Sequence, residues 1–277
     1  MCEERKRLDV LVYENKFASS REKAKEYINQ GKIYVDGIKE TKCGKKFLEK
    51  DIKIEFKGEV IPYVSRGGLK LHKAINEFNI NLENKICLDI GASTGGFTDC
   101  MLENGAKKVY AIDVGKDQLA QELRDNPKVV SMENTNVKYL TLEKIGQLCD
   151  FASIDVSFIS LEKVIPSVIN LLKEGGLCVA LIKPQFEAGI GKVNKKGVVK
   201  NISTHKDVII KVIKFLEGIN LKILNLSFSP IKGPNGNIEY LIEFVKEEKT
   251  EEFNLENVST VVTASHCKLA AEVVWKR

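Results

Sequence analysis

Four ionisable residues stand where a stable core would hold apolar side chains. Asp155 and Lys183 each end a predicted buried strand, in the runs DVSF and KPQFE. Lys70 opens a predicted helix after the run SRGGL, and Glu239 begins a strand after the turn GPNGN. Charged side chains at the carboxyl ends of parallel strands are unfavourable for stability but well placed for chemistry. Any one of them equally fits a structural salt bridge, but the set of four is harder to explain in that way.

A glycine-rich segment joins the first strand of the main domain to the helix that follows. Glycine lets the backbone approach a ligand closely, and open α/β sheets bind ligands at the carboxyl ends of their strands. The spacing is G-x-x-x-G-G, not G-x-G-x-x-G, and no Gly-Lys-Ser/Thr follows, so a dinucleotide or triphosphate site is poorly supported. The segment comprises Gly91, Ala92, Ser93, Thr94, Gly95, Gly96 and Phe97.

Three polar residues extend this candidate cofactor site. Asp113 ends the next strand, where the diol of a ribose lies in such folds, although on its own it equally fits a turn residue. Asn136 could read an adenine edge, and Asp155 closes a later strand. A strand-end glycine loop followed by a strand-end acid is typical of methyltransferases that use S-adenosylmethionine. We therefore expect that cofactor, bound by residues 91–97, Asp113, Asn136 and Asp155.

The elements that must position these residues alternate between strands and helices from residue 64 to residue 246. Near-continuous apolar strands separated by helices are typical of a sheet that is buried on both faces. Helices are predicted over 161–172 and 205–216 among others. We expect an α/β, Rossmann-like fold with a doubly wound, mostly parallel sheet. The predicted strands are Ile86–Ile90, Val109–Ile112, Phe151–Ile154, Leu177–Ile182, Lys222–Phe228 and Tyr240–Val245.

The N-terminal part is a small α+β domain of a different kind. A first helix is predicted over 7–15. A second begins at Ser19-Ser20-Arg21-Glu22, a capping-box spacing in which the serine caps an amide and the glutamate reaches back, and it ends at Gly31. Strands follow at 33–35 and 52–56, with an Asp-Gly turn after the first. Two short helices and a small ribbon bury little, which indicates a mini-domain.

Composition excludes several classes of protein. The chain has 277 residues, of which 43% are hydrophobic and 29% charged, as in a soluble globular protein. Its apolar runs are far shorter than the roughly 20 residues that span a bilayer, and its charged start is unlike a signal peptide. The seven cysteines never occur as C-x-x-C and the three histidines are isolated, so we expect no metal site and reduced thiols in the cytoplasm. The net charge of +5 is weak evidence for nucleic-acid binding.

The segment from about residue 5 to residue 57 resembles the S-four-like RNA-binding domain, which is named after a ribosomal protein. The resemblance rests on the runs ASSR (18–21) and INQGKIYVDG (28–37). Arg21 and Lys25 share a helix face, which alone fits a solvated surface, but within this pattern RNA binding is the better interpretation. The basic residues from which we expect RNA contacts are Arg7, Arg21, Lys25, Lys32 and Arg66.

Nearly the whole chain resembles the TlyA family, also called hemolysin A, which joins an S-four-like domain to an FtsJ/RrmJ-type methyltransferase. The motifs that carry the resemblance are SRGGLKL (65–71), LDIGASTGGF (88–97), DVSFIS (155–160), KPQFE (183–187) and GPNGNIEY (233–240). The expected organisation is an RNA-binding domain over 1–57, a linker over 58–63, a methyltransferase domain over 64–246 and a C-terminal tail of unknown role over 247–277.

The resemblance implies an activity and a set of roles. Lys70, Asp155, Lys183 and Glu239 match the K-D-K-E tetrad of ribose 2′-O-methyltransferases, and the loop 91–97 with Asp113 would bind S-adenosylmethionine. The family methylates cytidine ribose in ribosomal RNA of the large subunit and, in some members, of the small subunit. The implied partners are ribosomal RNA and ribosomal subunits, without a membrane, and we expect a monomer or a weak dimer.

The chemistry is consistent with that tetrad. A ribose 2′-hydroxyl is a weak acid, so its proton needs an acceptor within hydrogen-bond reach. A lysine with its reference pKa of about 10.4 is protonated, and a second lysine nearby together with partial burial lowers a lysine pKa. We expect Lys183 to be the base, Lys70 and Asp155 to shape its pKa and position, and Glu239 to hold Lys70 or the ribose. This mechanism needs no metal.

Other interpretations are less well supported. Methyltransferases that act on exocyclic amines usually carry an Asn/Asp-Pro-Pro-aromatic motif where this chain has Asp155-Val156-Ser157-Phe158. A non-catalytic RNA or ribosome binder with a degenerate methyltransferase fold is the main alternative, but the loop and all four tetrad residues are intact. A pore-forming toxin would need an amphipathic or membrane-length segment, and a nicotinamide oxidoreductase would need its glycine fingerprint.

Overall fold

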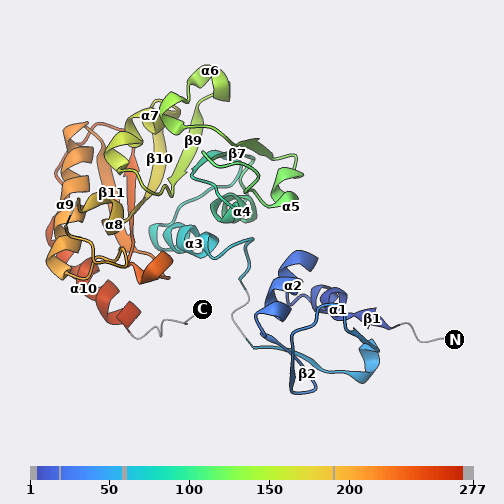
Figure 1. The fold of residues 1–277 in the computed structure, drawn as a ribbon. Coiled ribbons are helices and arrows are strands. Elements are labelled where there is room, and N and C mark those ends of the chain that lie inside the picture. Colours follow the sequence, from blue (N-terminus) through green and yellow to red (C-terminus); the bar gives the residue numbers. More distant parts are fainter. Residues whose placement is uncertain (1–4, 19, 58–60, 190, 271–277) are drawn as a thin grey trace. The chain divides into compact units, whose positions relative to one another are not determined.

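The structure, a computed structural model, describes residues 5–18, 20–57, 61–189 and 191–270. The chain divides into two compact units, residues 1–64 and 65–277 (Figure 1). Part of the predicted linker 58–63, namely residues 58–60, lies outside the described residues. Within the described ranges, no helix is long and apolar enough to cross a membrane.

The first unit packs two helices against small antiparallel sheets. Strand β2 lies between β3 and β5 in a three-stranded sheet, and β1 pairs with β4. Its core comprises Leu8, Val12, Ala18, Ala24, Tyr27, Ile28, Ile33 and Val35. The elements are β1 (Lys6–Arg7), α1 (Leu8–Glu14), α2 (Arg21–Asn29), β2 (Ile33–Val35), β3 (Ile38–Glu40), β4 (Lys46–Phe47), a 3-10 turn η1 (Glu49–Asp51) and β5 (Ile54–Phe56).

Local signals predicted both helices and strands β2 and β5 of this unit, whereas β1, β3 and β4 were not predicted. Helix α2 is followed by Gly31, which has φ of +67°, and the Asp-Gly turn links β2 to β3, so both turn predictions are confirmed. The predicted serine cap is confirmed one residue later than the capping-box spacing placed it, while Ser19, the first residue of that box, lies outside the described residues. The N-cap is Ser20, which accepts from Lys23 N at 3.2 Å, and Glu22 instead lies 3.6 Å from Lys25.

The second unit is built on a seven-stranded sheet with helices on both faces. The strand order is β11-β12-β10-β9-β6-β7-β8, and only β12 runs antiparallel to the others. Up to the centre of the sheet, the elements are α3 (Gly67–Phe78), β6 (Ile86–Ile90), α4 (Gly96–Glu103), β7 (Lys108–Ile112), α5 (Gln121–Arg124), β8 (Val129–Met132), η2 (Val137–Tyr139), α6 (Leu142–Ile145) and β9 (Cys149–Ile154). The rest are η3 (Leu161–Lys163), α7 (Ile165–Ile169), β10 (Leu172–Ile182), α8 (Pro184–Glu187), α9 (Ile202–Gly218), β11 (Lys222–Phe228), η4 (Pro234–Gly236), β12 (Tyr240–Val245) and α10 (Glu256–Ala270).

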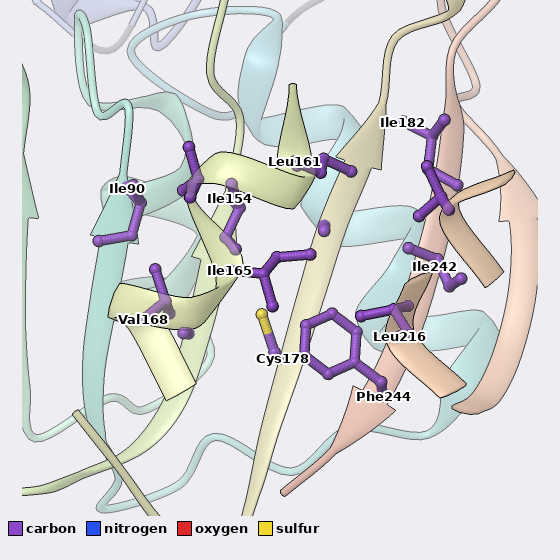
Figure 2. Close-up of a cluster of buried hydrophobic side chains, with 14 of the residues drawn as sticks. Ile90, Ile154, Leu161, Ile165, Val168, Cys178, Ile182, Leu216, Ile242 and Phe244 are labelled. Atoms are coloured by element: carbon purple, nitrogen blue, oxygen red, sulfur yellow. The ribbon is translucent and has the colours of Figure 1, made fainter. Parts of the chain in front are cut away.

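One face of this sheet carries the main hydrophobic core. Ile165 of α7 and Leu216 of α9 lie over strand residues such as Ile154, Ile242 and Phe244 (Figure 2). Burial of such side chains stabilises the unit by roughly 1.5–3 kcal/mol for each large apolar residue. The doubly wound, mostly parallel sheet that the strand pattern predicted is confirmed.

The helix predicted over 161–172 is wrong. The structure has the short helix η3, then α7, and at Leu172 strand β10 begins. Pro166 lies in the first turn of α7, and because proline lacks an N–H group and restricts the residue before it, the segment breaks into two short helices. Strand β10 therefore starts five residues before the predicted Leu177.

The C-terminal stretch contributes to the same core. Helix α10 packs Val258, Val262 and Leu269 into it, so the stretch expected as a tail of unknown role contains a structural helix. Residues 271–277, the end of that stretch, lie outside the described residues.

Candidate active site

The sheet topology brings the four tetrad residues together. Asp155 directly follows β9 and Lys183 directly follows β10, its parallel neighbour. Because β12 is antiparallel, its first residue, Tyr240, pairs with the last residue of β10. Glu239 therefore lies at the same edge of the sheet, and Lys70 reaches it from the first turn of α3.

The four side chains form one chain of ion pairs. Lys70 Nζ lies 2.7 Å from Glu239 Oε2 and 3.6 Å from Asp155 Oδ2. Lys183 Nζ lies 2.5 Å from Asp155 Oδ1 and 3.1 Å from the hydroxyl of Ser157. Glu239 is fully buried and both lysines are 7% exposed. Two positive and two negative charges balance within the cluster, as buried charges require.

The electrostatic environment keeps Lys70 protonated. Burial alone would lower the pKa of Lys70, but Asp155 and Glu239 outweigh it, so the pKa is raised above its ordinary value. The two carboxylates, 3.6 and 2.7 Å from Lys70 Nζ, favour the charged form of this lysine. Lys70 is a charged link between Glu239 and Asp155.

Two further residues of the KPQFE motif hold this cluster, although sequence reasoning gave neither a role. Gln185 donates from Nε2 to the second oxygen of Glu239 at 3.2 Å. Glu187, which is 6% exposed, accepts from Ser160 Oγ at 2.8 Å and from Leu161 N at 2.7 Å. Glu187 thereby joins KPQFE to DVSFIS. In the sequence, the acid that ends the KPQFE run, directly after an aromatic residue, was the signal that could have identified Glu187.

The glycine-rich loop lies beside the tetrad. Gly91, which follows β6, has φ of +86°, and a Cβ atom there would lie 2.5 Å from the carbonyl oxygen of Asp155. Only glycine fits such a close approach in this backbone conformation. The carboxylate of Asp113 accepts from Ser93 N at 2.8 Å and from Gly115 N at 2.7 Å, so the acid at the end of β7 holds the loop.

A hollow of about 150 Å³ lies between this loop, the start of α3 and Asp155. Of the residues expected to bind the cofactor, Gly95, Asp113 and Asn136 are not among those that line it. A Cβ atom at Gly95 would collide with Leu119 and Leu123, and Asn136 caps η2 by accepting from Lys138 N at 3.1 Å. The lining residues are Ser65, Gly67, Gly91, Ala92, Ser93, Thr94, Gly96, Phe97 and Asp155.

Sequence reasoning missed Ser65 and Gly67, which line the hollow, and Asp89, which supports it. Asp89 is fully buried and accepts from Thr98 Oγ1 at 2.7 Å and from Ser153 Oγ at 3.1 Å. Burial raises the pKa of Asp89 to about 6, against the opposing effect of these hydrogen bonds. Asp89 thus ties the first turn of α4 to β9. The signal for Asp89 in the sequence was an acidic residue within an otherwise apolar predicted strand.

The residues present fit S-adenosylmethionine. Gly91 lets the loop pack directly against the backbone of Asp155, and the wall of the hollow includes Asp155, the residue that contacts both lysines. Asp113 stands at the end of the neighbouring strand, and the segment leading to Asn136 contacts it through Thr135 N and Asp113 O at 2.8 Å. A ligand in the hollow would therefore lie against the tetrad.

In the first unit, a buried acid gathers two of the predicted RNA-binding residues. Asp9 is fully buried, and its carboxylate accepts from Arg7 at 2.9 Å and from Arg21 at 3.2 Å. Lys32 lies over the ring of Tyr27, with Nζ 5.1 Å from its centroid. Lys25 pairs with Glu22, and Arg66 is exposed at the start of α3 in the second unit. Sequence reasoning missed Asp9.

Comparison with known proteins agrees with this architecture. Residues 63–246 match the FtsJ-like methyltransferase family and residues 6–52 match the S4 domain. YqxC of Bacillus subtilis, provisionally named an rRNA methyltransferase, is 45% identical over 96% of both chains. The 16S/23S rRNA (cytidine-2′-O)-methyltransferase TlyA of Mycobacterium tuberculosis is 37% identical over 86% of this chain and 89% of its own.

A solved structure from Streptococcus thermophilus, which bears a provisional hemolysin title, is 42% identical. It covers 97% of this chain and 98% of its own, with a TM-score of 0.76. The predicted fold, S4 domain, methyltransferase activity and S-adenosylmethionine cofactor are thereby confirmed. The chain belongs to the FtsJ-like methyltransferases, in the group that carries an N-terminal S4 domain and includes TlyA and hemolysin A.

Proposed function

We propose that this protein methylates the 2′-hydroxyl of cytidine ribose in ribosomal RNA of the large subunit and, as a further substrate, of the small subunit. The observation that carries the proposal is the position of Asp155, which lines the hollow and also contacts both lysines of the tetrad. The name of the Mycobacterium tuberculosis relative supports cytidine as the target nucleoside and both subunits as substrates.

The cofactor would be held by residues 91–97 and by Asp113, with Asn136 near the base. S-adenosylmethionine supplies, when bound, an electrophilic methyl group on a positively charged sulfur. Gly91 and Gly96 line the hollow, and the contact between Asp113 and Ser93 N keeps the loop in place. Alignment of the ribose oxygen with that methyl group is the main contribution of the protein.

Lys183 is the group that takes the proton. For this step the Lys183 ammonium first gives up its own proton to solvent, and the neutral amine then accepts the proton of the 2′-hydroxyl as the O–H bond breaks. The electron pair left on the oxygen would form the new bond to the methyl carbon while the bond from that carbon to sulfur breaks, and the cofactor would leave as the neutral thioether. Asp155 and Ser157 orient the Lys183 side chain through contacts of 2.5 and 3.1 Å. Lys70 stays charged, and Glu239 holds it in position.

The S4 domain would bind the RNA around the target. Arg7 and Arg21, which Asp9 holds side by side, are suited to contact phosphate groups. Lys25, Lys32 and Arg66 would add positive charge. Because ribosomal RNA is the substrate, we place the protein in the cytoplasm, where we expect it to act as a monomer or a weak dimer; sedimentation of the purified protein measures that state.

The test is methyl transfer from labelled S-adenosylmethionine to ribosomal subunits and to naked ribosomal RNA, with wild type compared to Lys183→Ala. We expect label at a cytidine 2′-oxygen with wild type and none with the variant, while cofactor binding is retained. Unchanged transfer by the variant would refute the role of Lys183. Cofactor binding without transfer to any RNA would favour a non-catalytic RNA binder.

A further inference from the structure

The segment after the KPQFE motif is strongly basic. Between Glu187 and Asp207 the chain contains five lysines and no acid. Four of them lie in residues 191–200, here called the basic loop, which runs between α8 and α9. These four are Lys192, Lys195, Lys196 and Lys200.

Three of these lysines are free to bind an anion. Lys195, Lys196 and Lys200 are exposed, and within the part of the chain that the structure describes none of them forms an ion pair. Lys192 is 3.9 Å from Asp207, but this pair is more than half exposed and therefore weak. The positive charge of the basic loop is thus left uncompensated by the protein.

The tip of the basic loop has a defined conformation. Asn194 and Val198 are hydrogen-bonded through Asn194 N and Val198 O at 3.0 Å, which closes a turn. The side chain of Asn194 also accepts from Lys196 N at 2.8 Å and from Val198 N at 3.0 Å. Lys195 and Lys196 therefore stand together at the end of an ordered turn, where a side chain loses less conformational entropy on binding than in a flexible loop.

The base of the basic loop is anchored to the segment that carries Glu239. Val199 is buried; its N–H donates to Asn237 Oδ1 at 3.2 Å, and its carbonyl lies 3.0 Å from Nε2 of His205. Asn237 also donates from Nδ2 to Gly197 O at 2.9 Å. Because two residues span at most about 7 Å of backbone, Asn237 keeps the loop close to Glu239.

His205 extends this anchor to β12. A carbonyl only accepts, so His205 donates from Nε2 to Val199, and its Nδ1 accepts from the hydroxyl of Tyr240 at 3.0 Å. Tyr240 directly follows Glu239. The basic loop is therefore held on both sides of Glu239.

The tetrad itself adds no net charge beside the basic loop. The tetrad contributes two positive and two negative charges. Helix α9 begins at Ile202, just after the basic loop, and its first turn contains no acid. The amino end of a helix carries a partial positive charge, which adds to that of Lys200 and its neighbours.

We propose that the basic loop binds phosphate groups of the substrate RNA beside the target ribose, as a contact separate from the S4 domain. Exposed lysines without an ion-pair partner on a fixed loop are suited to bind the phosphates of an RNA backbone, and such contacts do not depend on base sequence. Anchoring at Asn237 and His205 means that a phosphate held by the loop has a set position relative to the tetrad. The proposal rests on the proposed function for the identity of the RNA.

The experiment compares two triple variants of the full chain with the same net charge. The test variant is Lys195→Gln, Lys196→Gln and Lys200→Gln. The matched control is Lys107→Gln, Lys128→Gln and Lys222→Gln, whose positions lie at the amino ends of β7, β8 and β11, at the opposite edge of the sheet. Retention of labelled ribosomal RNA on a filter, methyl transfer and cofactor affinity are measured for both over a range of salt concentrations.

If the basic loop binds RNA, the test variant loses affinity for RNA and nothing else. Each phosphate contact on a single strand is worth about fourfold in affinity at about 0.15 M salt, so we expect RNA affinity to fall by at least about tenfold and KM for RNA to rise to match. The slope of log affinity against log salt becomes shallower by about 2. Cofactor affinity and kcat stay unchanged, and the control variant stays within about twofold of wild type.

The outcomes separate this proposal from the proposed function. If the two variants lose RNA affinity equally, or if neither does, the basic loop is not an RNA contact. If wild type binds ribosomal RNA but transfers no methyl group, the proposed function fails, while the comparison of the two variants still decides the role of the loop. A test variant that loses cofactor affinity as well contradicts a role limited to RNA.

Discussion

Replacement of Glu239 by glutamine removes a buried charge while keeping almost the same side-chain volume. The carboxylate lies 2.7 Å from Lys70 Nζ, and neither group has appreciable contact with solvent. At that distance and an effective dielectric constant of about 20, the attraction between two unit charges is about 6 kcal/mol. Part of this attraction offsets the desolvation of both groups, so removal of one partner from such a pair costs about 3–5 kcal/mol of stability.

We therefore expect Glu239→Gln to lower the free energy of unfolding of the methyltransferase unit by about 3–5 kcal/mol, and its melting temperature by about 10 °C. The pKa of Lys70 is raised in the folded state, so the pair contributes fully below the unfolded pKa of a lysine, about 10.4. The difference from wild type is thus constant between neutral pH and about pH 10, and it shrinks as the pH rises further.

The matched control is Glu243→Gln in the same strand. Glu243 is also buried, but its partner is Asn225, 2.6 Å away, and burial raises the pKa of Glu243. Because no cation is left unpaired, this variant should lie within about 1 kcal/mol of wild type. The double variant Lys70→Met with Glu239→Gln should recover part of the loss, since it buries no unpaired ammonium.

Denaturant unfolding monitored by circular dichroism, with methyl transfer measured in parallel, decides the outcome. We expect transfer by Glu239→Gln to fall by at least about a hundredfold, in the range typical of lost acid–base groups. Equal stability losses for Glu239→Gln and Glu243→Gln would refute the reasoning, because the effect would then follow from burial alone and not from the ion pair with Lys70.

Three further changes test the parts of the site that surround the tetrad. Burial raises the pKa of Asp89 to about 6, so the free energy of unfolding of wild type falls as the pH rises from about 4 to about 6.5 and this carboxyl is forced to ionise. The Asp89→Asn variant has no such carboxyl, so its free energy of unfolding should rise by about 3 kcal/mol relative to that of wild type over the same interval. The Gly91→Ala variant should lose S-adenosylmethionine affinity by at least about tenfold, since the new Cβ lies 2.5 Å from the carbonyl of Asp155 in a backbone with φ of +86°. The Asp9→Asn variant should bind ribosomal RNA more weakly although its net charge becomes more positive, because Asp9 holds Arg7 and Arg21 side by side.

Each of these changes has its own measurement. Unfolding free energies at several pH values report on Asp89, and parallel curves for variant and wild type would contradict the raised pKa. Titration calorimetry with the cofactor reports on Gly91, with Gly146→Ala as the control because Gly146 has φ of +80° and nothing within 4 Å of its Cβ position. Filter binding reports on Asp9; tighter binding would mean that net charge matters more than arginine placement.

Strands with a strong apolar pattern were the most predictable part of the sheet. The runs Ile86–Ile90, Lys222–Phe228 and Tyr240–Val245 match β6, β11 and β12 residue for residue. Strands β1, β3, β4 and β8 were not predicted. Each has only two to four residues, and β3 is also largely polar, so no extended apolar pattern marks them. The helix predicted over 161–172 failed because Pro166 divides it into η3 and α7, and because Leu172 already belongs to β10.

The sequence by itself determined which residues carry the chemistry and which edge of the sheet they occupy. Residues at the carboxyl ends of parallel strands share an edge whatever the details of packing, so Asp155 and Lys183 could be placed at the same edge from the common direction of their strands. The motifs around Gly91 and Lys183 further indicated the family and its cofactor. These inferences need only local pattern and direction of strands.

Only the tertiary structure shows which side chains contact one another. Lys70 and Glu239 are 169 residues apart in sequence, and their contact depends on the antiparallel placement of β12 and the position of α3. The same holds for Asp9 with its two arginines, for Asp89 with Thr98, and for the anchoring of the basic loop at Asn237. Such contacts join side chains from different elements, so their distances follow from sheet order and register, which no local pattern of residues encodes.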